Sequence, residues 1–348
     1  VRPNLRHFTF IKESKLNMIA STGFAVISSK KINPRFLYYY LTTDRYTNYL
    51  SSIADAHTST YPAFNPDILE DSEILFPPDN EQRAIAKILS DLDDKIELNH
   101  QMNKTLESIA QAIFKRWFVD FEFPNELGMP YKSFGGKMVD SELGKIPEKW
   151  NVKTLGEMNL DIGDGNYSSK YPSIDEFVEE GVPFIRANNM INGILYNNDM
   201  RHISDEKHSK LLKGHLKKGD ILIVTRGDIG QIAFVPEFFV DANINAQLVR
   251  INGEGKIDSY FLGLAFMSKE IQEDIQSLKT GTALQQLPIH NLLKIKLVIP
   301  CRNIENEFSK VAMSLYNQIE ENLLQIQRLS QIRDSFLPKL MSGKIRVN

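Results

Sequence analysis

Two long stretches of the chain carry apolar residues at the three- and four-residue spacing of an amphipathic helix. They cover residues 79–118 and about 304–337. In the first stretch the stripe consists of Ile85, Ile88, Leu92, Ile96, Leu106, Ile113 and Trp117. Pro77-Pro78 ends a preceding predicted strand, and Asp79 can cap the new helix. At 1.5 Å per residue, a helix of about 40 residues is roughly 60 Å long, so we expect each stretch to form a rod.

Asparagines interrupt each apolar stripe, Asn99 and Asn103 in the first and Asn322 in the second, and Asn322 is equivalent to Asn99 in the repeat described below. A buried Asn in such a seam lowers stability but fixes the register and the partner. Each helix could instead pack alone against its own globular domain. Because the two seams match in length and in their polar interruptions, we expect the helices to pack on each other as an antiparallel coiled coil.

The two helices belong to a longer internal repeat. Lys95-Ile96-Glu97 matches Gln318-Ile319-Glu320, 223 residues further on, and Phe36-Leu37 matches Tyr260-Phe261 at a separation of 224. A nearly constant separation indicates duplication. The second copy begins near Leu143, so we expect the first copy to lack the N-terminal part of its globular domain.

The remaining segments predict an α+β fold, in which globular domains of mixed α/β structure are joined by the two long helices. Short β-rich runs cover 183–186, 220–225, 232–235, 247–251 and 294–299, and helices are predicted at 204–212 and 259–277. A Gly- and Pro-rich stretch reads as a linker. The predicted divisions are a partial first domain (1–78), the first long helix (79–120), the linker (121–149), a second domain (150–300), and the second long helix with a closing segment (301–348).

Composition limits the classes of protein that remain. The chain has 348 residues, 42% of them hydrophobic and 24% charged, as in an ordinary globular protein. Its net charge of −3 argues against coating nucleic acid through bulk charge. The single cysteine, Cys301, excludes an intramolecular disulfide and fits a reducing cytoplasm. No apolar run approaches the ~18 residues that span a bilayer, so we expect no membrane partner.

Catalytic motifs are missing from the sequence. Gly135-Gly136-Lys137 is followed by Met138, where a phosphate-binding loop needs Ser or Thr. No Asn or Asp precedes Pro-Pro and an aromatic residue, the arrangement with which an amino-methyltransferase grips a flipped base. The histidines include no pair at zinc-helix spacing, and we expect His202 and His208 to be solvated. The sequence therefore predicts a protein with no cofactor, no metal site and no catalytic residues.

Polar residues suited to reading base edges follow two predicted strands. Arg186, Asn188 and Asn189 could present a guanine-directed guanidinium beside adenine-directed amides. Arg226 follows another strand, and the repeat places Arg2 at the same position. A turn arginine is more often a solvated or structural charge, but its recurrence makes the two interpretations equally strong.

A second group of polar residues completes the candidate DNA-binding set. Thr280-Gly281-Thr282 forms a polar loop that could contact phosphate or cap the next helix, and it is matched in part by residues 57–60. The further candidates are Gln231, Lys170, Thr282, Gln285, Arg6 and Thr58.

Several long motifs resemble one known family. The runs 80–86, 92–99 and 113–121 resemble the first conserved region of the specificity subunit of Type I restriction-modification enzymes, 144–150 resembles the start of its second target-recognition domain, and 336–344 resembles its C-terminal motif. The resemblance implies two target-recognition domains that each read half of a split double-stranded DNA target. It also implies helices that hold them apart and dock modification subunits. Methylation and cleavage would then belong to the modification and restriction subunits, and this subunit would be non-catalytic.

Bulky residues near the helix ends are candidates for docking a partner: Ile113, Phe114, Trp117, Phe118, Leu337 and Leu340. Aromatic residues are enriched at interaction hot spots, although these could equally close the rod onto the neighbouring domain. The alternative function is a coiled-coil adaptor that binds protein rather than DNA. The acidic net charge and the lack of a basic cluster support that alternative.

Overall fold

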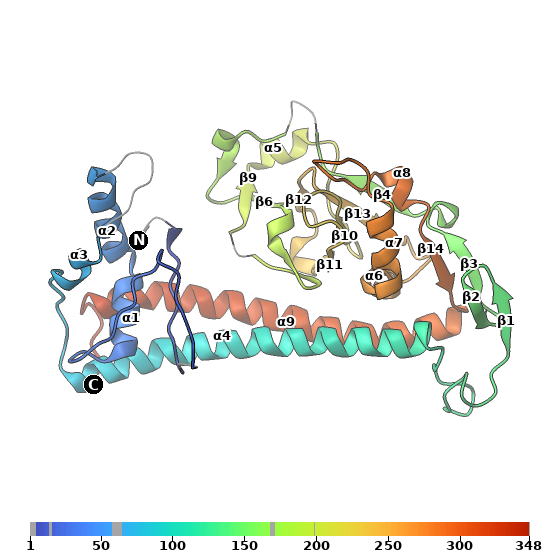
Figure 1. The fold of residues 1–348 in the computed structure, drawn as a ribbon. Coiled ribbons are helices and arrows are strands. Elements are labelled where there is room, and N and C mark those ends of the chain that lie inside the picture. Colours follow the sequence, from blue (N-terminus) through green and yellow to red (C-terminus); the bar gives the residue numbers. More distant parts are fainter. Residues whose placement is uncertain (1–4, 14–15, 58–64, 168–170, 198, 348) are drawn as a thin grey trace. The chain divides into compact units, whose positions relative to one another are not determined.

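The computed structural model describes residues 5–13, 16–57, 65–167, 171–197 and 199–347. They form two compact units, of which unit 1 is Val1–His100 with Leu324–Asn348 and unit 2 is Gln101–Leu323. Two long helices, α4 (Asp79–Phe114) and α9 (Arg302–Met341), each contribute to both units (Figure 1). The prediction of two long helices is confirmed. None of the helices in the described ranges is long and apolar enough to cross a membrane.

Within each unit, α4 and α9 run antiparallel and pair through buried polar side chains. In unit 1, Asn99 Nδ2 donates to Gln325 Oε1 at 3.2 Å, and in unit 2, Asn322 Nδ2 donates to Asn103 Oδ1 at 2.8 Å. Asn99 is 0% exposed and Asn322 is 2% exposed. Both therefore lie in the seam as predicted, but Asn322 pairs with Asn103, because the antiparallel arrangement brings that residue level with it.

Unit 1 packs three short helices onto one end of the pair. These helices are α1 (Pro34–Thr42), α2 (Asp44–His57) and α3 (Asp67–Glu70). Phe36 and Leu340 are buried in one core with Ile85 and Leu89 of α4. Leu340, at 3% exposure, therefore contributes to the core of unit 1. This burial favours a core role, and a docking role for Leu340 stays a prediction.

The strand predicted before Pro77 is not present among the described residues of unit 1. Residues 72–78 are assigned neither to a helix nor to a strand and pair with no described strand, and Leu75 is 86% exposed. A β-strand depends on inter-strand hydrogen bonds, which this apolar segment does not make with the described residues.

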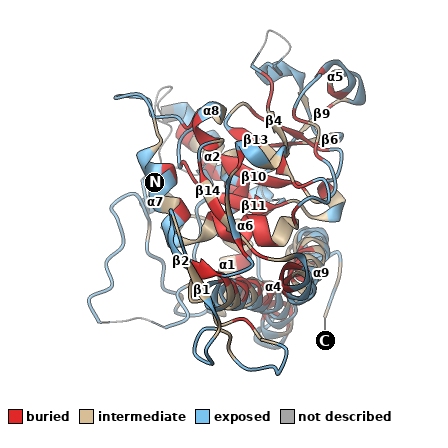
Figure 2. Ribbon diagram, turned by 90° about the vertical axis from the view of Figure 1, so that its right-hand side faces the viewer, coloured by how far each residue is buried: buried red, intermediate tan, exposed pale blue. Residues whose placement is uncertain are grey.

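Among its described residues, unit 2 contains two four-stranded sheets and three two-stranded ones. The antiparallel central sheet has the order β11-β10-β13-β4 and the mixed sheet the order β12-β6-β9-β5; the pairs are β1-β2, β14-β3 and β7-β8. Figure 2 shows buried residues concentrated in the strands of the central sheet. The strands are β1 (Met138–Ser141), β2 (Gly144–Pro147), β3 (Asn151–Thr154), β4 (Asp161–Asp164), β5 (Phe177–Val178), β6 (Val182–Ile185), β7 (Met190–Ile191), β8 (Ile194–Leu195), β9 (Arg201–Ile203), β10 (Ile221–Val224), β11 (Ile232–Phe234), β12 (Asn243–Ile244), β13 (Leu248–Asn252) and β14 (Lys296–Ile299).

The described part of unit 2 also contains the shorter α-helices α5 (Asp205–Lys210), α6 (Ser259–Met267), α7 (Lys269–Ser277) and α8 (Ile289–Leu292). Residues 259–277 were predicted as one helix, but they form two. Ser268 has an extended backbone, with φ −64° and ψ 151°, and separates α6 from α7. No proline or glycine marks this break, so the sequence carried only a weak signal for it.

A group of six aromatic rings, the junction cluster, joins the end of α4 to α6, α9 and Trp150. Its members are Phe114, Trp117, Phe118, Trp150, Phe261 and Phe308. Phe118 lies in the π-helical turn Lys115–Val119 that follows α4, and its ring centroid is 4.8 Å from that of Phe261 and 4.9 Å from that of Phe308. These rings bury the end of α4 against the second domain.

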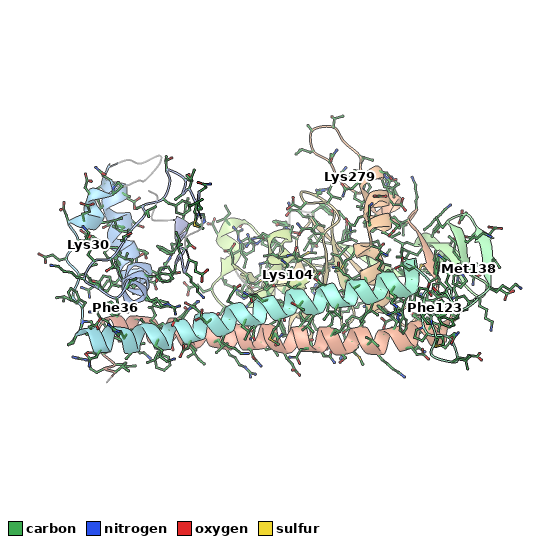
Figure 3. The ribbon with its side chains drawn as sticks, turned by 60° about the horizontal axis from the view of Figure 1, so that its bottom comes forward. Lys30, Phe36, Lys104, Phe123, Met138 and Lys279 are labelled. Carbon is green, nitrogen blue, oxygen red and sulfur yellow. The ribbon has the colours of Figure 1, made fainter. Side chains whose placement is uncertain are left out.

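The segment predicted as a linker contains ordered structure. Phe123 stacks between Tyr131, at a centroid distance of 4.6 Å, and Trp150, at 4.9 Å. Figure 3 shows Phe123 near the end of α4 and Met138 in the adjacent hairpin. Residues 138–147 form that hairpin, β1-β2. The turn residues that suggested a linker instead connect short packed elements.

The internal repeat is visible in both units as the same contact between the cap of a short helix and the first turn of a long helix. In unit 1, Asn33 caps α1 and its backbone N–H donates to Gln82 Oε1 at 2.8 Å. In unit 2, Asp258 caps α6 and its backbone N–H donates to Glu305 Oε1. Gln82 and Glu305 lie in the first turns of α4 and α9. Each long helix therefore begins by holding the cap of a short helix in its own unit.

Candidate nucleic-acid interface

A cavity of about 880 Å³ in unit 2 brings together four of the predicted DNA-binding residues. Arg186, Asn188, Arg226 and Gln231 all line it. The first two follow β6, whereas the other two begin and end the turn between β10 and β11. Residues from two sheets therefore converge on one concave surface.

Arg226 is exposed at the end of a fully buried strand. All four residues of β10 are buried, and the turn then reverses at Gly227, whose φ of +88° suits glycine. The Arg226 guanidinium lies 4.9 Å from the ring centroid of Tyr167, a cation–π contact. It forms no ion pair with a described residue, so its charge is free to meet an anionic or guanine ligand.

Asp199 positions the guanidinium of Arg186. Arg186 Nη2 donates to the Asp199 carbonyl at 2.6 Å and to its carboxylate at 3.0 Å. Asn188 Nδ2 lies 3.4 Å from the same carboxylate. Asn189 differs, because it is 1% exposed and its Oδ1 accepts the backbone N–H of Arg186. Asn189 therefore shapes the turn, which favours a structural role, and base reading by this residue stays a prediction.

The polar loop at 280–286 lies beside Arg226. Arg226 and Gln286 form an antiparallel backbone bridge, and Leu287 N–H donates to Thr225 O at 2.9 Å. Thr282 and Gln285 are exposed in this loop. Figure 3 shows a projecting loop of unit 2 beside Lys279, the residue that precedes this polar loop. Thr282 and Gln285, from the second group of candidates, thus lie in a loop that is paired with the Arg226 turn. The sequence alone could not establish this.

Other candidates are separate from this surface or outside the described ranges. Arg6 belongs to unit 1, where Nη2 donates to Asp44 Oδ1 at 2.6 Å and where it lines a cavity of about 420 Å³. Arg2, Lys170 and Thr58 lie outside the described residues.

The predicted docking surface at the end of α4 is largely buried. Phe114 and Phe118 are each 5% exposed and belong to the junction cluster. Rings of the same chain cover both, which favours the alternative that they close the rod onto the neighbouring domain, and their role in docking stays a prediction. Ile113, Trp117 and Leu337 are partly exposed, and their role in docking stays a prediction.

The structure also identifies residues that sequence reasoning missed. Glu107, Asp228 and Gln247 line the 880 Å³ cavity, and Gln231 Nε2 donates to Asp228 Oδ2 at 3.3 Å. His208, expected to be solvated, is only 9% exposed. Asp228 is two residues from Arg226 in the sequence, so its place in the site could have been predicted. No feature of the sequence around Glu107 predicted that this residue lines the cavity.

Glu107 is a buried carboxyl group on the wall of the cavity. It is 5% exposed, and burial raises its pKa to about 7, with an opposing hydrogen bond from Gln111. Gly193 lies directly against it, since a Cβ there would come within 2.2 Å of Glu107 Oε1. The charge of the cavity wall consequently changes near neutral pH.

We expect Glu107→Gln to change how the stability of the chain depends on pH. The pKa of Glu107 is raised from about 4.5 to about 7, so the folded chain retains a proton that the unfolded chain releases. The free energy of unfolding should therefore fall as pH rises through this window. The variant lacks the titrating group and should be more stable than wild type at pH 8, with little difference at pH 4.5. Urea unfolding across this range measures the effect.

Glu126→Gln is the matched control, because Glu126 is exposed. That control should follow the wild-type profile. Parallel pH profiles for wild type and Glu107→Gln would contradict the assignment of a raised pKa to Glu107.

Comparison with known proteins identifies the family. The family model described as the Type I restriction modification DNA specificity domain matches residues 7–108 and 147–328. The HindI specificity subunit of Haemophilus influenzae is 27% identical over 99% of this chain and 85% of its own length. The MjaIX specificity subunit of Methanocaldococcus jannaschii is 30% identical over 97% of this chain and 75% of its own length.

A solved structure has the same fold. The S subunit of a Type I restriction-modification system from M. genitalium aligns with a TM-score of 0.50 at 18% identity, covering 89% of this chain and 73% of that one. With most of the chain matched by the family model and by full-length relatives, this chain belongs to the specificity subunits of Type I restriction-modification enzymes.

Proposed function

We propose that unit 2 reads one half of a bipartite DNA target through the surface that carries Arg186, Asn188, Arg226 and Gln231. The chain is a DNA-recognition subunit by family, so the alternative of an adaptor that binds only protein is not favoured. The observation that carries the proposal is the convergence of these four residues on one cavity. Guanidinium and amide groups are the side chains that pair with guanine and adenine edges in the major groove.

The neighbouring loop would supply contacts of another kind. Thr282 and Gln285 are exposed beside the Arg226 turn, where hydroxyl and amide groups could hold phosphate oxygens and orient the duplex. Arg186, held by Asp199, is positioned in advance of binding. Pre-ordered side chains lose less conformational entropy when they meet a ligand.

We further propose that each of the two segments matched by the family model contains a target-recognition domain or part of one. Residues 150–300 would be one target-recognition domain and 1–78 part of another, which the two segments matched by the family model support. Residues 79–120 and 301–348 would be the conserved helical regions, and 121–149 would connect them.

The partners of the chain are part of the proposal. Its family implies a non-catalytic role, and we propose that modification and restriction subunits supply methylation and cleavage. The single cysteine, Cys301, supports a reducing compartment such as the cytoplasm.

Selection from random duplex DNA tests the proposed function. The full chain is assembled with the modification subunit of its own system, and bound duplexes are sequenced after repeated rounds. We expect enrichment of a defined sequence, together with methylation at that sequence when methyl donor is added. The modification subunit without this chain is the control. If bound DNA is not enriched over that control, the proposed function is wrong.

A further inference from the structure

Two histidines and one aspartate lie together in unit 2, and none of them lines the 880 Å³ cavity. His208 lies in α5, His215 in the loop that follows it, and Asp241 just after the short helix Glu237–Phe239. Their ligand atoms all lie within 4.8 Å of one another. His208 is buried, His215 is half-buried and Asp241 is exposed. Nothing in the proposed DNA-reading role uses this group.

The distances are those of ligands around a shared ion. His208 Nε2 lies 3.4 Å and His215 Nδ1 lies 3.6 Å from the same oxygen, Asp241 Oδ1. Both separations exceed the 2.7–3.2 Å of an ordinary N–H···O hydrogen bond. Zinc bonds of about 2.0–2.1 Å to nitrogen or oxygen at tetrahedral angles place neighbouring ligand atoms about 3.3–3.4 Å apart.

The tautomer of His215 presents a lone pair to the aspartate. His215 Nε2 lies at hydrogen-bonding distance from the carbonyl oxygen of Leu211. A carbonyl can only accept, so Nε2 carries the hydrogen and Nδ1 of the neutral ring is a bare acceptor. That acceptor faces the carboxylate oxygen of Asp241, an arrangement that a cation between them makes favourable. Metal-binding histidines commonly donate their other ring nitrogen to a backbone carbonyl in this way.

Hydrogen bonding does not account for the burial of His208. Its Nδ1 is buried without a hydrogen-bond partner among the described residues. The ring centroid of His208 lies 4.2 Å from that of His215, so two rings are held together beside one carboxylate. Nε2 is the ring nitrogen that faces Asp241 and would bind an ion, whereas Nδ1 would keep its hydrogen without a partner among the described residues.

The backbone holds the three groups in place. Asp241 N–H donates to Leu216 O and Leu216 N–H donates to Ala242 O, each at 2.9 Å. His215 forms a backbone bridge with Asn243. Asp241 itself has a φ of +67°, in the left-handed region. The loop that carries His215 is thus fastened to the turn that carries Asp241.

We propose that His208, His215 and Asp241 bind one divalent transition-metal ion, with Zn²⁺ the best match to the ligand distances. Two imidazole nitrogens and a carboxylate oxygen are ordinary zinc ligands, and three protein ligands leave one tetrahedral position for water. The ion would tie α5 and its following loop to the turn at Asp241. Its role would be to stabilise this edge of unit 2.

Metal titration of the full chain, without a histidine tag, tests the proposal. After treatment with chelator and its removal, the chain is titrated with Zn²⁺ against a chromogenic chelator. We expect one equivalent to bind tightly and to raise the Tm. Co²⁺ should bind in its place with the intense visible absorption of a tetrahedral site. His208→Gln, His215→Gln and Asp241→Asn should each lower the affinity by at least about tenfold, since even second-shell changes cost roughly 10- to 100-fold.

His202→Gln is the matched control, because His202 lies in β9 of the same unit and outside this group. Circular dichroism in the presence of chelator tests whether each variant is folded. Where a variant is unfolded, His215→Ala is used in its place. Absence of stoichiometric binding overturns the proposal. An equal loss of affinity in His202→Gln, or unchanged affinity in Asp241→Asn, overturns it as well.

Discussion

Replacing Phe118 by alanine is expected to lower the free energy of unfolding of the isolated chain by about 3–5 kcal/mol, the usual loss for truncating a buried phenylalanine. The ring is 5% exposed and contacts the rings of all five other members of the junction cluster. Its removal leaves a cavity where the end of α4 meets α6 and α9. Urea unfolding followed by tryptophan fluorescence reports on this region, because Trp117 and Trp150 both belong to the cluster.

The same experiment separates a core role for Phe118 from a docking role. A docking residue would be exposed in the isolated chain, so its truncation would leave stability unchanged and weaken only complex assembly. Phe134→Ala is the control, because Phe134 is 59% exposed and such surface changes usually stay within about 0.5 kcal/mol. A Phe118→Ala variant as stable as that control would contradict the burial described here.

Replacing Arg226 by alanine is expected to weaken binding to the selected DNA by about 5- to 150-fold. That range corresponds to the ~1–3 kcal/mol by which one bidentate arginine–guanine pair discriminates against the wrong base. Arg226 is exposed, has no ion pair with a described residue and is supported by the ring of Tyr167. Fluorescence anisotropy with the assembled complex, on duplexes that each carry one altered base pair, measures both affinity and discrimination.

The substitution Arg226→Lys distinguishes base reading from phosphate binding. Lysine keeps the charge but loses the planar fork. If Arg226 reads a base, the lysine variant loses discrimination at one base pair and keeps the salt dependence. If Arg226 holds phosphate, the alanine variant weakens all sequences alike and lowers the salt slope by about one. Arg116→Ala, a change to an exposed arginine of the turn after α4, is the control. Equal affinity of Arg226→Ala and that control would contradict any DNA contact by Arg226.

The long helices were predictable because their signal is local and repeated. Apolar residues recur along nearly forty positions, and no other structure buries such a stripe as well. The strands of the central sheet were predictable for a similar reason, as β10 consists of four consecutive buried apolar residues. The break at Ser268 was missed because serine, although it is a favoured N-cap and begins α7 here, also occurs within helices and is a weaker signal than proline or glycine.

The candidate site was predictable only where its residues follow strands. Arg186 and Arg226 stand immediately after strand patterns, so their place at the edge of a sheet could be inferred. Glu107 reaches this cavity through tertiary packing, because it lies in α4, about 80 residues before Arg186. His208 was misjudged because its neighbours along the chain are polar, while its burial comes from residues on other elements.

The pairing of α4 with α9 also determines how the chain must fold. Asn103 and Asn322 are separated by 219 residues, and closing a flexible loop of that length costs about 5 kcal/mol of chain entropy. At a synthesis rate of roughly 5–20 residues per second, α4 leaves the ribosome some 10–45 s before its partner helix is made. During that interval its apolar stripe is uncovered. Folding of the intervening domain shortens the loop, so that domain should form first and the helix pair should close last.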